Sequence, residues 1–231
     1  MTGSGRVGVG VIGAGVISAQ YLDNLTAFPD VVVLFVADLD LDRARAQAEK
    51  YGIPGSGSTE ELLAHDGIEI VVNLTIPAVH VEVAMLALAA GKNVWSEKPF
   101  ALDRESGSAL LREADARGLR VATAPDTFLG AGLQAAKRII DGGGIGTPLT
   151  ALALFQAPGP ESWHPAPDFL YAKGAGPLFD MGPYYVTALV QSLGPVARVS
   201  AAASTSRATR VIGSGPRAGE EFPVEVPTHV S

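Results

Sequence analysis

Residues 6–18 of the chain are RVGVGVIGAGVIS, and this stretch decides the fold class. RVGVGVI (6–12) is apolar after Arg6, as expected of a strand that is buried on both of its faces. The turn Gly13-Ala14-Gly15 follows, and we predict a helix from there to about Phe28. A buried strand, a glycine turn and a helix in this order are typical of the start of a parallel sheet covered by helices.

The same alternation continues as far as residue 124. The apolar runs predict further strands at 31–38, 68–74, 93–97 and 120–124. Helical patterns separate them at 41–51, 58–63, 80–91 and 103–117, and Ser58 with Glu61 forms a candidate capping box. The pattern predicts an α/β domain over 1–124, with a doubly wound parallel sheet between two layers of helices.

The pattern changes after residue 125, and we predict a second, α+β domain over 125–231. It has expected helices at 131–141 and from about 180 to 193, a strand in TPLTALALFQ (147–156), and polar strand-like segments beyond 195. Two strand-like segments do not form a stable sheet alone. We therefore expect their partners to come from a further C-terminal portion or from another chain.

Composition excludes several classes of protein. The chain is 47% hydrophobic and 18% charged, with a net charge of −7 and no block of basic residues, which argues against nucleic acid or anionic membrane as partners. It has no cysteine, and its four histidines have no mutual spacing of metal ligands, so we predict no metal site. We find no signal peptide and no long apolar span, and expect a soluble, cytoplasmic protein.

The glycine turn has a chemical use. Gly13 permits the tight turn, and Gly15 lets a pyrophosphate approach the N–H groups at a helix N-terminus. Asp38 ends the second strand 25 residues after Gly13, where a carboxylate can bind a ribose 2′-hydroxyl and repel a 2′-phosphate. This favours NAD over NADP. The basic Arg43 nearby could bind a 2′-phosphate, so NADP stays an alternative. The simpler interpretations are a plain strand–helix turn and an Asp38 that only caps the next helix.

Two further segments end strands at the edge of the sheet where ligands bind. One strand ends at Asn73-Leu74-Thr75-Ile76-Pro77, where Pro77 could simply fix the connection to the next helix. That helix begins at His80, which is itself a candidate for capping or packing. Glu97-Lys98-Pro99 ends the next strand. A lysine there can bind a substrate hydroxyl and stabilise developing alkoxide character, although a surface pair with Glu97 is the alternative.

Four segments in this order and spacing resemble the Gfo/Idh/MocA oxidoreductase family, which includes glucose–fructose oxidoreductase and inositol dehydrogenase. They are GVIGAGVIS, the acid Asp38, NLTIPAVHVEVAMLALAAGKNVWSEKPFAL (73–102) and GAGPLFDMGPYYVTALVQSLGPVARVSA (174–201). The resemblance covers residues 6–231. It implies a Rossmann domain that binds NAD(P), followed by a domain built on an open, mainly antiparallel sheet through which the chain forms a homo-oligomer. The implied substrate is a sugar, inositol or related polyol that reacts at a carbinol carbon by hydride transfer.

The resemblance also implies site residues. Lys98 and Asp180 match active-site positions, and Tyr184 stands where most members of the family have histidine. The chain also stops before the usual C-terminus of the family. The residues implied in cofactor binding are Gly13, Ala14, Gly15, Val16, Ile17, Asp38, Thr75, Pro77, His80, Glu97 and Lys98.

Asp180 and Tyr184 are four residues apart and so share a helix face. A tyrosine phenol has a pKa near about 10, which a neighbouring ammonium group lowers. We therefore expect Tyr184 to be the acid/base, Lys98 to tune it and bind the substrate hydroxyl, and Asp180 to orient the substrate. Tyr184 as a packed aromatic, and Tyr185 or His164 as the acid/base, are the alternatives.

The loop before residue 171 is the last candidate site. Trp163 and His164, with Glu161 nearby and Tyr185 on the following helix, could line a sugar site, because a flat ring packs on the C–H face of a sugar. The alternative is a loop anchored by a buried tryptophan. For the whole chain, a sugar or polyol dehydrogenase competes with a non-catalytic nucleotide-binding sensor or regulator on the same scaffold, and with an inactive fragment.

Overall fold

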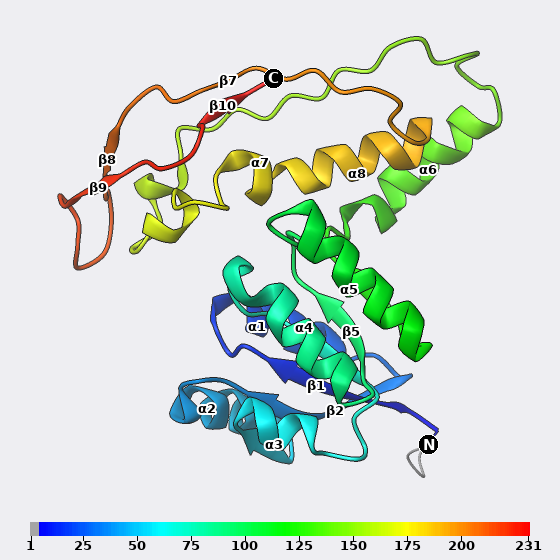
Figure 1. Cartoon of the computed structure of the whole chain (residues 1–231), viewed down its shortest axis with the longest axis vertical. Coiled ribbons are helices and arrows are strands. Elements are labelled where there is room, and N and C mark those ends of the chain that lie inside the picture. Colours follow the sequence, from blue (N-terminus) through cyan, green and yellow to red (C-terminus); the bar gives the residue numbers. More distant parts are fainter. Residues whose placement is uncertain (1–4) are drawn as a thin grey trace. The chain divides into compact units, whose positions relative to one another are not determined.

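The structure is a computed structural model that describes residues 5–231. The chain divides into two compact units, the first ending at Ala124 and the second beginning at Pro125 (Figure 1). The described part of the first unit has one sheet and that of the second has two small ones, and each unit has its own buried core.

A six-stranded sheet forms the centre of the first unit, in the order β3-β2-β1-β4-β5-β6. All neighbouring strands are parallel. The chain adds strands on one side of β1 and then on the other, so the direction reverses between β1 and β4, which is where open α/β sheets bind ligands. The strands are β1 (Val7–Ile12), β2 (Val31–Ala37), β3 (Gly55–Gly57), β4 (Ile70–Asn73), β5 (Asn93–Ser96) and β6 (Val121–Thr123).

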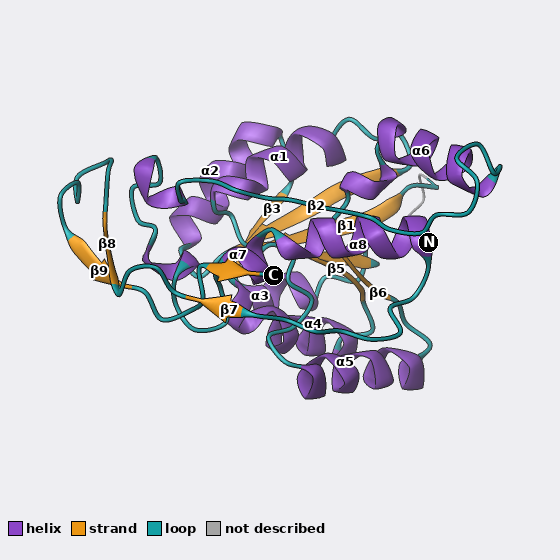
Figure 2. Ribbon diagram, turned by 90° about the horizontal axis from the view of Figure 1, so that it is seen from above, coloured by secondary structure: helices purple, strands orange, loops and turns teal. Residues whose placement is uncertain are grey.

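Helices cover both faces of this sheet (Figure 2). Because successive side chains of a strand point to opposite faces, Val11 packs with Leu22 of α1 and Ala48 of α2, whereas Ile12 packs with the other three helices. These two apolar clusters are the core of the unit, and the predicted doubly wound sheet is confirmed. The helices are α1 (Val16–Leu25), α2 (Leu41–Tyr51), α3 (Thr59–Leu63), α4 (His80–Ala89) and α5 (Arg104–Arg117).

The helix ends follow local sequence signals. The predicted capping box is confirmed at α3, where the Ser58 side chain accepts the Glu61 N–H and the Glu61 carboxylate accepts the Ser58 N–H. Asp40 caps α2 through the Arg43 N–H, and Gly52 ends that helix with a φ of 65°, a left-handed conformation that favours glycine. These signals fix where each helix meets the loops at the edge of the sheet.

Strand β3 was not expected, since GSG has no β-branched or aromatic residue. The structure gives the reason for this composition. A Cβ atom at Gly55 would lie 2.4 Å from the ring of Phe35 on β2, so only glycine allows the two backbones to pair at this point. The remaining predicted strands of the first unit are all present.

The second unit is built on helices and short antiparallel pairs. Strand β7 (Ala203–Ser204) pairs with β10 (His229–Val230), and β8 (Thr209–Val211) pairs with β9 (Glu221–Pro223). Tyr171, Ile212 and Phe222 form its buried cluster. Helices α6 (Ala131–Asp141) and α8 (Gly182–Leu193) pack together, and the single turn α7 (Pro177–Asp180) precedes α8. Four short 3-10 turns complete the described elements, at Pro77–Val79, Thr127–Leu129, Pro160–Ser162 and Asp168–Leu170.

The strand predicted at 147–156 is wrong. Residues 148–157 have no regular structure, and Leu149, Leu152 and Leu154 are largely exposed. A strand needs a neighbour to bond its backbone, and within residues 5–231 this segment pairs with none of the sheets. The alternation of its sequence is therefore not sufficient to make a strand in this chain.

No helix formed by residues 5–231 combines the length and the apolar character needed to cross a membrane.

Candidate functional site

The turn between β1 and α1 lies at the carboxyl end of the central strand. Gly13 has a φ of 104°, and a Cβ atom there would lie 2.7 Å from the backbone C and O of Leu74 on the loop after β4. Gly15 has ordinary extended angles and open space where a Cβ would be. The two glycines therefore have different uses, because Gly13 lets two loops touch and Gly15 leaves room for a ligand.

The N-terminus of α1 is open to a ligand. No side chain of the described residues caps this helix, and the first two residues, Val16 and Ile17, are exposed. Ser18 is completely buried and its hydroxyl donates to the Gly15 carbonyl at 2.6 Å. This bond holds the first turn of the helix, and a small residue here permits the close packing of helix and strand.

Asp38 follows β2 and is directed to the same turn. Its Oδ2 accepts the Ala14 N–H at 2.7 Å, and its Oδ1 accepts the Asp40 N–H at 2.9 Å. A carboxylate has about four acceptor positions, so two remain after these bonds. Capping of α2 is the role of Asp40, which accepts the Arg43 N–H. The simpler interpretation of Asp38 as the cap of that helix is therefore wrong.

Arg43 is engaged by the same cap. Its Nη2 lies 3.2 Å from Oδ2 of Asp40, and the pair is half exposed. The backbone N–H and side chain of Arg43 lower the pKa of Asp40 below its usual value, so this carboxylate stays charged at neutral pH. The arrangement surrounds the end of β2 with two carboxylates, which disfavours a further negative charge there.

The loop after β4 is fixed by a buried polar network. Asn73 is fully buried, and its side chain donates to the His80 carbonyl at 3.0 Å and accepts from the Thr75 hydroxyl at 2.7 Å. His80 is 1% exposed, and its two ring nitrogens each lie 2.8 Å from a carbonyl oxygen, those of Pro99 and Thr75. The His80 side chain therefore lies behind the loops rather than on their ligand-facing surface. Pro77 begins the 3-10 turn that leads into α4.

The segment Glu97-Lys98-Pro99 follows β5 at this same edge. The Glu97 carboxylate accepts the Tyr21 hydroxyl at 2.8 Å and the Lys98 N–H at 2.9 Å. Lys98 is half-buried, and its peptide bond to Pro99 is cis. Tyr21 was not identified from the sequence, because no local signal links a tyrosine on α1 to an acid 76 residues later.

The three residues expected on the second unit belong to α7 and α8. Asp180 ends α7, and Tyr184 and Tyr185 lie in the first turns of α8. All three are partly buried, and the Tyr185 ring packs against Phe155 with 6.0 Å between centroids. This contact gives Tyr185 a packing role within its own unit.

The loop of Trp163 and His164 is anchored differently from what was expected. Trp163 is 66% exposed, so the alternative of a buried tryptophan anchor is wrong. The buried aromatic residue is Tyr171, at 3% exposed, whose hydroxyl donates to Glu161. Arg210 on β8 donates to Oε1 of the same carboxylate at 2.5 Å. We call Glu161, Tyr171 and Arg210 the Glu161 cluster.

The Glu161 cluster is held by charge and by hydrogen bonds. Burial works to raise the pKa of Glu161, but the hydrogen bonds from Tyr171 and Arg210 and the charge of Arg210 lower it below its usual value. Burial, with the neighbouring carboxylate, raises the pKa of the Tyr171 phenol. Tyr171 is therefore a donor at all ordinary pH values and not an acid/base. Glu161 anchors the loop that carries Trp163.

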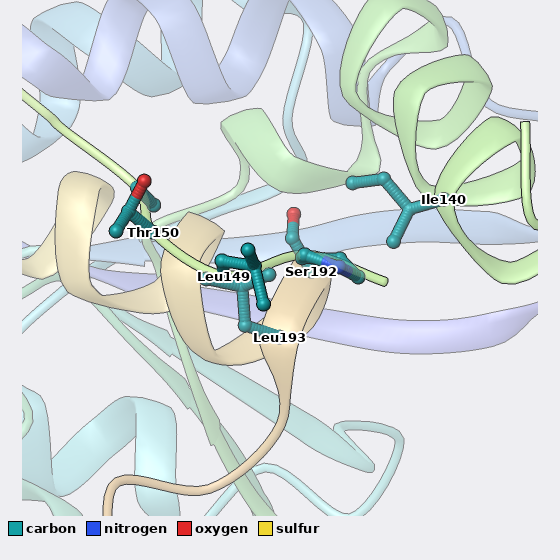
Figure 3. Close-up of a pocket in the computed structure, with 7 residues that line it drawn as sticks. Ile140, Leu149, Thr150, Ser192 and Leu193 are labelled. Atoms are coloured by element: carbon teal, nitrogen blue, oxygen red, sulfur yellow. The ribbon is translucent and has the colours of Figure 1, made fainter. Parts of the chain in front are cut away.

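A separate pocket lies in the second unit, between the ends of α6 and α8 (Figure 3). Its lining is mostly apolar, with Ser192 and Thr150 as its hydroxyl groups. Tyr184 lies eight residues from Ser192 on α8, or about 12 Å along the helix axis. The pocket is therefore at the opposite end of α8 from the proposed acid/base.

The described residues of the first unit thus define a doubly wound nucleotide-binding domain, with its glycine turn, acid and lysine at one edge. Comparison with known proteins agrees. Residues 7–124 match the oxidoreductase family with an NAD-binding Rossmann fold, and residues 133–231 match the GFO/IDH/MocA C-terminal domain. The chain belongs to the Gfo/Idh/MocA oxidoreductase family. The resemblance drawn from the sequence is confirmed.

Individual relatives give the same result. The chain is 33% identical to inositol 2-dehydrogenase 3 of Saccharopolyspora erythraea over 69% of its length and 48% of the relative. It is 32% identical to trans-1,2-dihydrobenzene-1,2-diol dehydrogenase of Homo sapiens, over 77% of this chain and 53% of the relative. A solved NAD-binding oxidoreductase from Klebsiella pneumoniae superposes with a TM-score of 0.80 at 26% identity, covering 98% and 62% of the two chains. The chain spans about half the length of the curated relatives it matches.

The edge of the first unit fits the NAD that this family binds. A Cβ atom at Gly15 would stand in open space at an uncapped helix N-terminus, where a pyrophosphate can meet backbone N–H groups. Asp38 keeps two acceptor positions, the number that the two hydroxyls of one ribose need. The expected cofactor class is confirmed by the family, whereas the individual residue roles remain predictions.

Proposed function

We propose that this chain is an NAD-dependent dehydrogenase that oxidises a secondary alcohol on a cyclic sugar, inositol or related polyol, or reduces the corresponding ketone. The observation that carries the proposal is the position of Lys98. It follows β5, next to the strand pair β1/β4 where the glycine turn and the loop of Thr75 meet. A lysine at that edge supplies a cation beside a bound dinucleotide, and such a cation stabilises a developing alkoxide.

The names of the relatives support this substrate class. Inositol 2-dehydrogenase and trans-1,2-dihydrobenzene-1,2-diol dehydrogenase are both named for cyclic substrates with hydroxyl groups on adjacent ring carbons. Both matches extend over more than two thirds of this chain. We therefore place a ring with neighbouring hydroxyls first among the substrates to test.

NAD is the preferred form of the cofactor in this proposal. Asp38 offers acceptors to a 2′-hydroxyl and would repel a 2′-phosphate. Arg43, the residue that could favour NADP, is paired with Asp40. The cation is thus already balanced by a carboxylate at the position where the phosphate would need it.

The mechanism assigns a role to each residue of the proposed site. NAD, when bound at this edge, would supply the acceptor for the hydride of the carbinol carbon. Lys98 donates a hydrogen bond to the substrate oxygen and stabilises its negative charge while the C–H bond breaks. Tyr184 accepts the hydroxyl proton in oxidation and returns it in reduction, and Asp180 holds a neighbouring hydroxyl. Asp180 ends α7 and Tyr184 lies in the first turn of α8, so the two side chains come from consecutive helices and not from one face of a single helix as expected.

Trp163 and His164 are proposed substrate contacts rather than acid/base groups. The Nδ1 atom of His164 accepts the Ala166 N–H at 3.1 Å, and its ring packs against Trp163 and Phe169. The exposed indole of Trp163 can pack on the C–H face of a sugar ring. The homo-oligomer that the family resemblance implies, through the sheet of the second unit, stays a prediction.

The test uses the whole 231-residue chain. NADH is titrated by fluorescence, and NAD-linked turnover is then followed on a panel of inositols, cyclic diols and pyranoses. The proposal expects NADH binding and turnover of at least one cyclic compound with adjacent hydroxyls. Binding without turnover on the whole panel supports the non-catalytic sensor instead, and loss of binding contradicts the dinucleotide site itself.

A further inference from the structure

The carboxylate of Glu97 joins two distant parts of the first unit. Its Oε1 atom accepts the hydroxyl of Tyr21 on α1 at 2.8 Å, and its Oε2 atom accepts the backbone N–H of Lys98 at 2.9 Å. Tyr21 precedes Glu97 by 76 residues, so the side chain ties the helix after β1 to the segment after β5. We call the hydrogen bonds from Tyr21 through the Glu97 carboxylate to the Lys98 N–H the Glu97 link.

The direction of each hydrogen bond in the link is fixed by the groups that make it. The indole Nε1 of Trp95 can only donate, and it lies 3.4 Å from the hydroxyl oxygen of Tyr21. The hydroxyl accepts this long bond and turns its own proton to Glu97. A backbone N–H can only donate, so Lys98 supplies the second bond to the carboxylate. Hydrogen bonds to a carboxylate are stronger than those between neutral groups, which makes Tyr21–Glu97 the firm part of the link.

The parts on which the link rests are themselves held in place. The rings of Tyr21 and Trp95 both pack against the apolar cluster between the sheet and α1 and α2. The main chain of Glu97 is bonded on both sides, since its N–H donates to the Asn73 carbonyl at 2.8 Å and its carbonyl accepts the Thr123 hydroxyl at 3.3 Å. A fixed main chain and a fixed phenol together determine where the Glu97 carboxylate lies, and hence where it holds the Lys98 N–H.

Tyr21 is set back from the place expected for the pyrophosphate. It lies six residues after Gly15, or about 9 Å along the axis of α1. The N–H groups open to a pyrophosphate are those of the first turn, next to Gly15. Removing the Tyr21 hydroxyl therefore leaves the proposed dinucleotide contacts of α1 intact, so its effect on Lys98 can be measured separately.

We propose that Tyr21 is a positioning residue, which acts through Glu97 to set the backbone of Lys98 and thereby the place of the lysine ammonium group beside the substrate oxygen. The effect on turnover rests on the proposed function, whereas the link itself does not. Without the hydroxyl, the Glu97 carboxylate loses the donor that comes from α1, and the Lys98 N–H that it holds becomes free to open.

Tyr51 provides a matched control within the same unit. Its ring packs against the same apolar cluster as that of Tyr21, and it is likewise partly buried. Its hydroxyl donates to a carboxylate at the same distance of 2.8 Å, but this carboxylate belongs to Asp23, an exposed residue of α1. Tyr51→Phe therefore removes an equivalent phenol–carboxylate bond that does not lead to Lys98.

The first experiment measures amide hydrogen exchange by nuclear magnetic resonance on the whole chain without cofactor. We expect exchange at the Lys98 N–H to become at least about tenfold faster in Tyr21→Phe and to stay unchanged in Tyr51→Phe, because only the first substitution releases the link. Unchanged exchange at Lys98 in Tyr21→Phe overturns the proposal. Equal acceleration in both variants shows a general loosening of the unit and overturns it as well.

The second experiment measures turnover and NADH affinity. In an active wild-type chain, Tyr21→Phe lowers kcat about tenfold and changes the Kd for NADH less than about threefold, because the phenol acts through Lys98 and not on the dinucleotide. Tyr51→Phe leaves both quantities within about twofold of the wild type. A larger loss in NADH affinity than in kcat for Tyr21→Phe contradicts positioning.

A double variant tests whether the phenol acts through the carboxylate. In a Glu97→Ala background the link is already broken, so Tyr21→Phe should lower kcat by less than about twofold. The same loss of kcat in both backgrounds would show that the two residues act independently, which overturns the proposal. If the wild-type chain has no turnover, the proposed function fails, while exchange at the Lys98 N–H still decides on the link.

Discussion

Replacing each glycine of the β1–α1 turn by alanine should separate folding from cofactor binding. Gly13→Ala forces a side chain into a φ of 104°, which costs about 1–3 kcal/mol, and places its methyl group 2.7 Å from backbone atoms of Leu74. Backbone cannot move aside as the end of a side chain can. We expect the free energy of unfolding of the first unit to fall by about 2–4 kcal/mol in total.

Gly15→Ala should instead leave stability nearly unchanged and weaken NADH binding. Its φ of −72° and ψ of −169° suit any residue, and its methyl group meets no protein atom within 4 Å. The smaller entropy of the unfolded chain and the weaker N-cap offset each other, so stability should change by less than about 1 kcal/mol. The methyl group would instead keep a pyrophosphate from the N–H groups. Losing one such bond to a charged group costs about 1.5–3 kcal/mol, or about 10- to 100-fold in the Kd for NADH.

The assay is urea unfolding followed by tryptophan fluorescence, together with NADH titration of each variant. The chain has two tryptophans, Trp95 in the first unit and Trp163 in the second, so the variant Trp163→Phe isolates the signal of the first unit. A Gly15→Ala variant that binds NADH as tightly as the wild type would refute the assignment of the pyrophosphate to this turn. A Gly13→Ala variant of wild-type stability would show that the contact with Leu74 relaxes.

Three further outcomes are expected. Asp38→Ala should weaken NADH binding at least about tenfold, because the hydrogen bonds from the ribose hydroxyls to a charged carboxylate are lost, and should reduce the preference for NADH over NADPH by at least about tenfold, measured by parallel titrations. Arg210→Met should destabilise the second unit by about 1.5–3 kcal/mol in urea unfolding, because the partly buried Glu161 carboxylate loses a charged hydrogen-bond donor, and adding Glu161→Gln should restore part of the loss. The pKa of the Tyr171 phenol is raised in the folded protein, so its contribution to the free energy of unfolding is complete below about pH 10, the pKa in the unfolded chain. That contribution is lost as the pH rises further. Tyr171→Phe should therefore make the free energy of unfolding less dependent on pH above about 10.

The first unit could be predicted almost completely from its sequence, because its signals are local. Apolar runs such as VVVLFVAD and the capping box of Ser58 and Glu61 carry their structure within a few residues. Strand β3 was missed because its glycines are selected by the Phe35 ring of a neighbouring strand. That requirement is a contact in space, and GSG alone does not express it.

The second unit was harder to predict. The alternating segment at 147–156 indicated a strand, but a strand exists only with a partner, and pairing is not encoded within the segment itself. A loop anchored by a buried tryptophan was the alternative that the sequence offered, whereas the buried aromatic residue is Tyr171, whose hydroxyl donates to Glu161. The sequence also named His80 as a site residue, but only the structure shows that its ring nitrogens each lie 2.8 Å from a carbonyl oxygen, those of Pro99 and Thr75.

The central claim, that Lys98 serves hydride chemistry beside a bound dinucleotide, is tested most directly by Lys98→Met. Turnover on the best cyclic substrate and the Kd for NADH are measured for this variant, for the wild type and for Lys50→Met, which removes an exposed lysine on α2. The account predicts at least about a 100-fold loss of kcat for Lys98→Met, with a Kd for NADH within about threefold of the wild type and an unaffected control. Turnover of the Lys98→Met variant at the wild-type rate would contradict it.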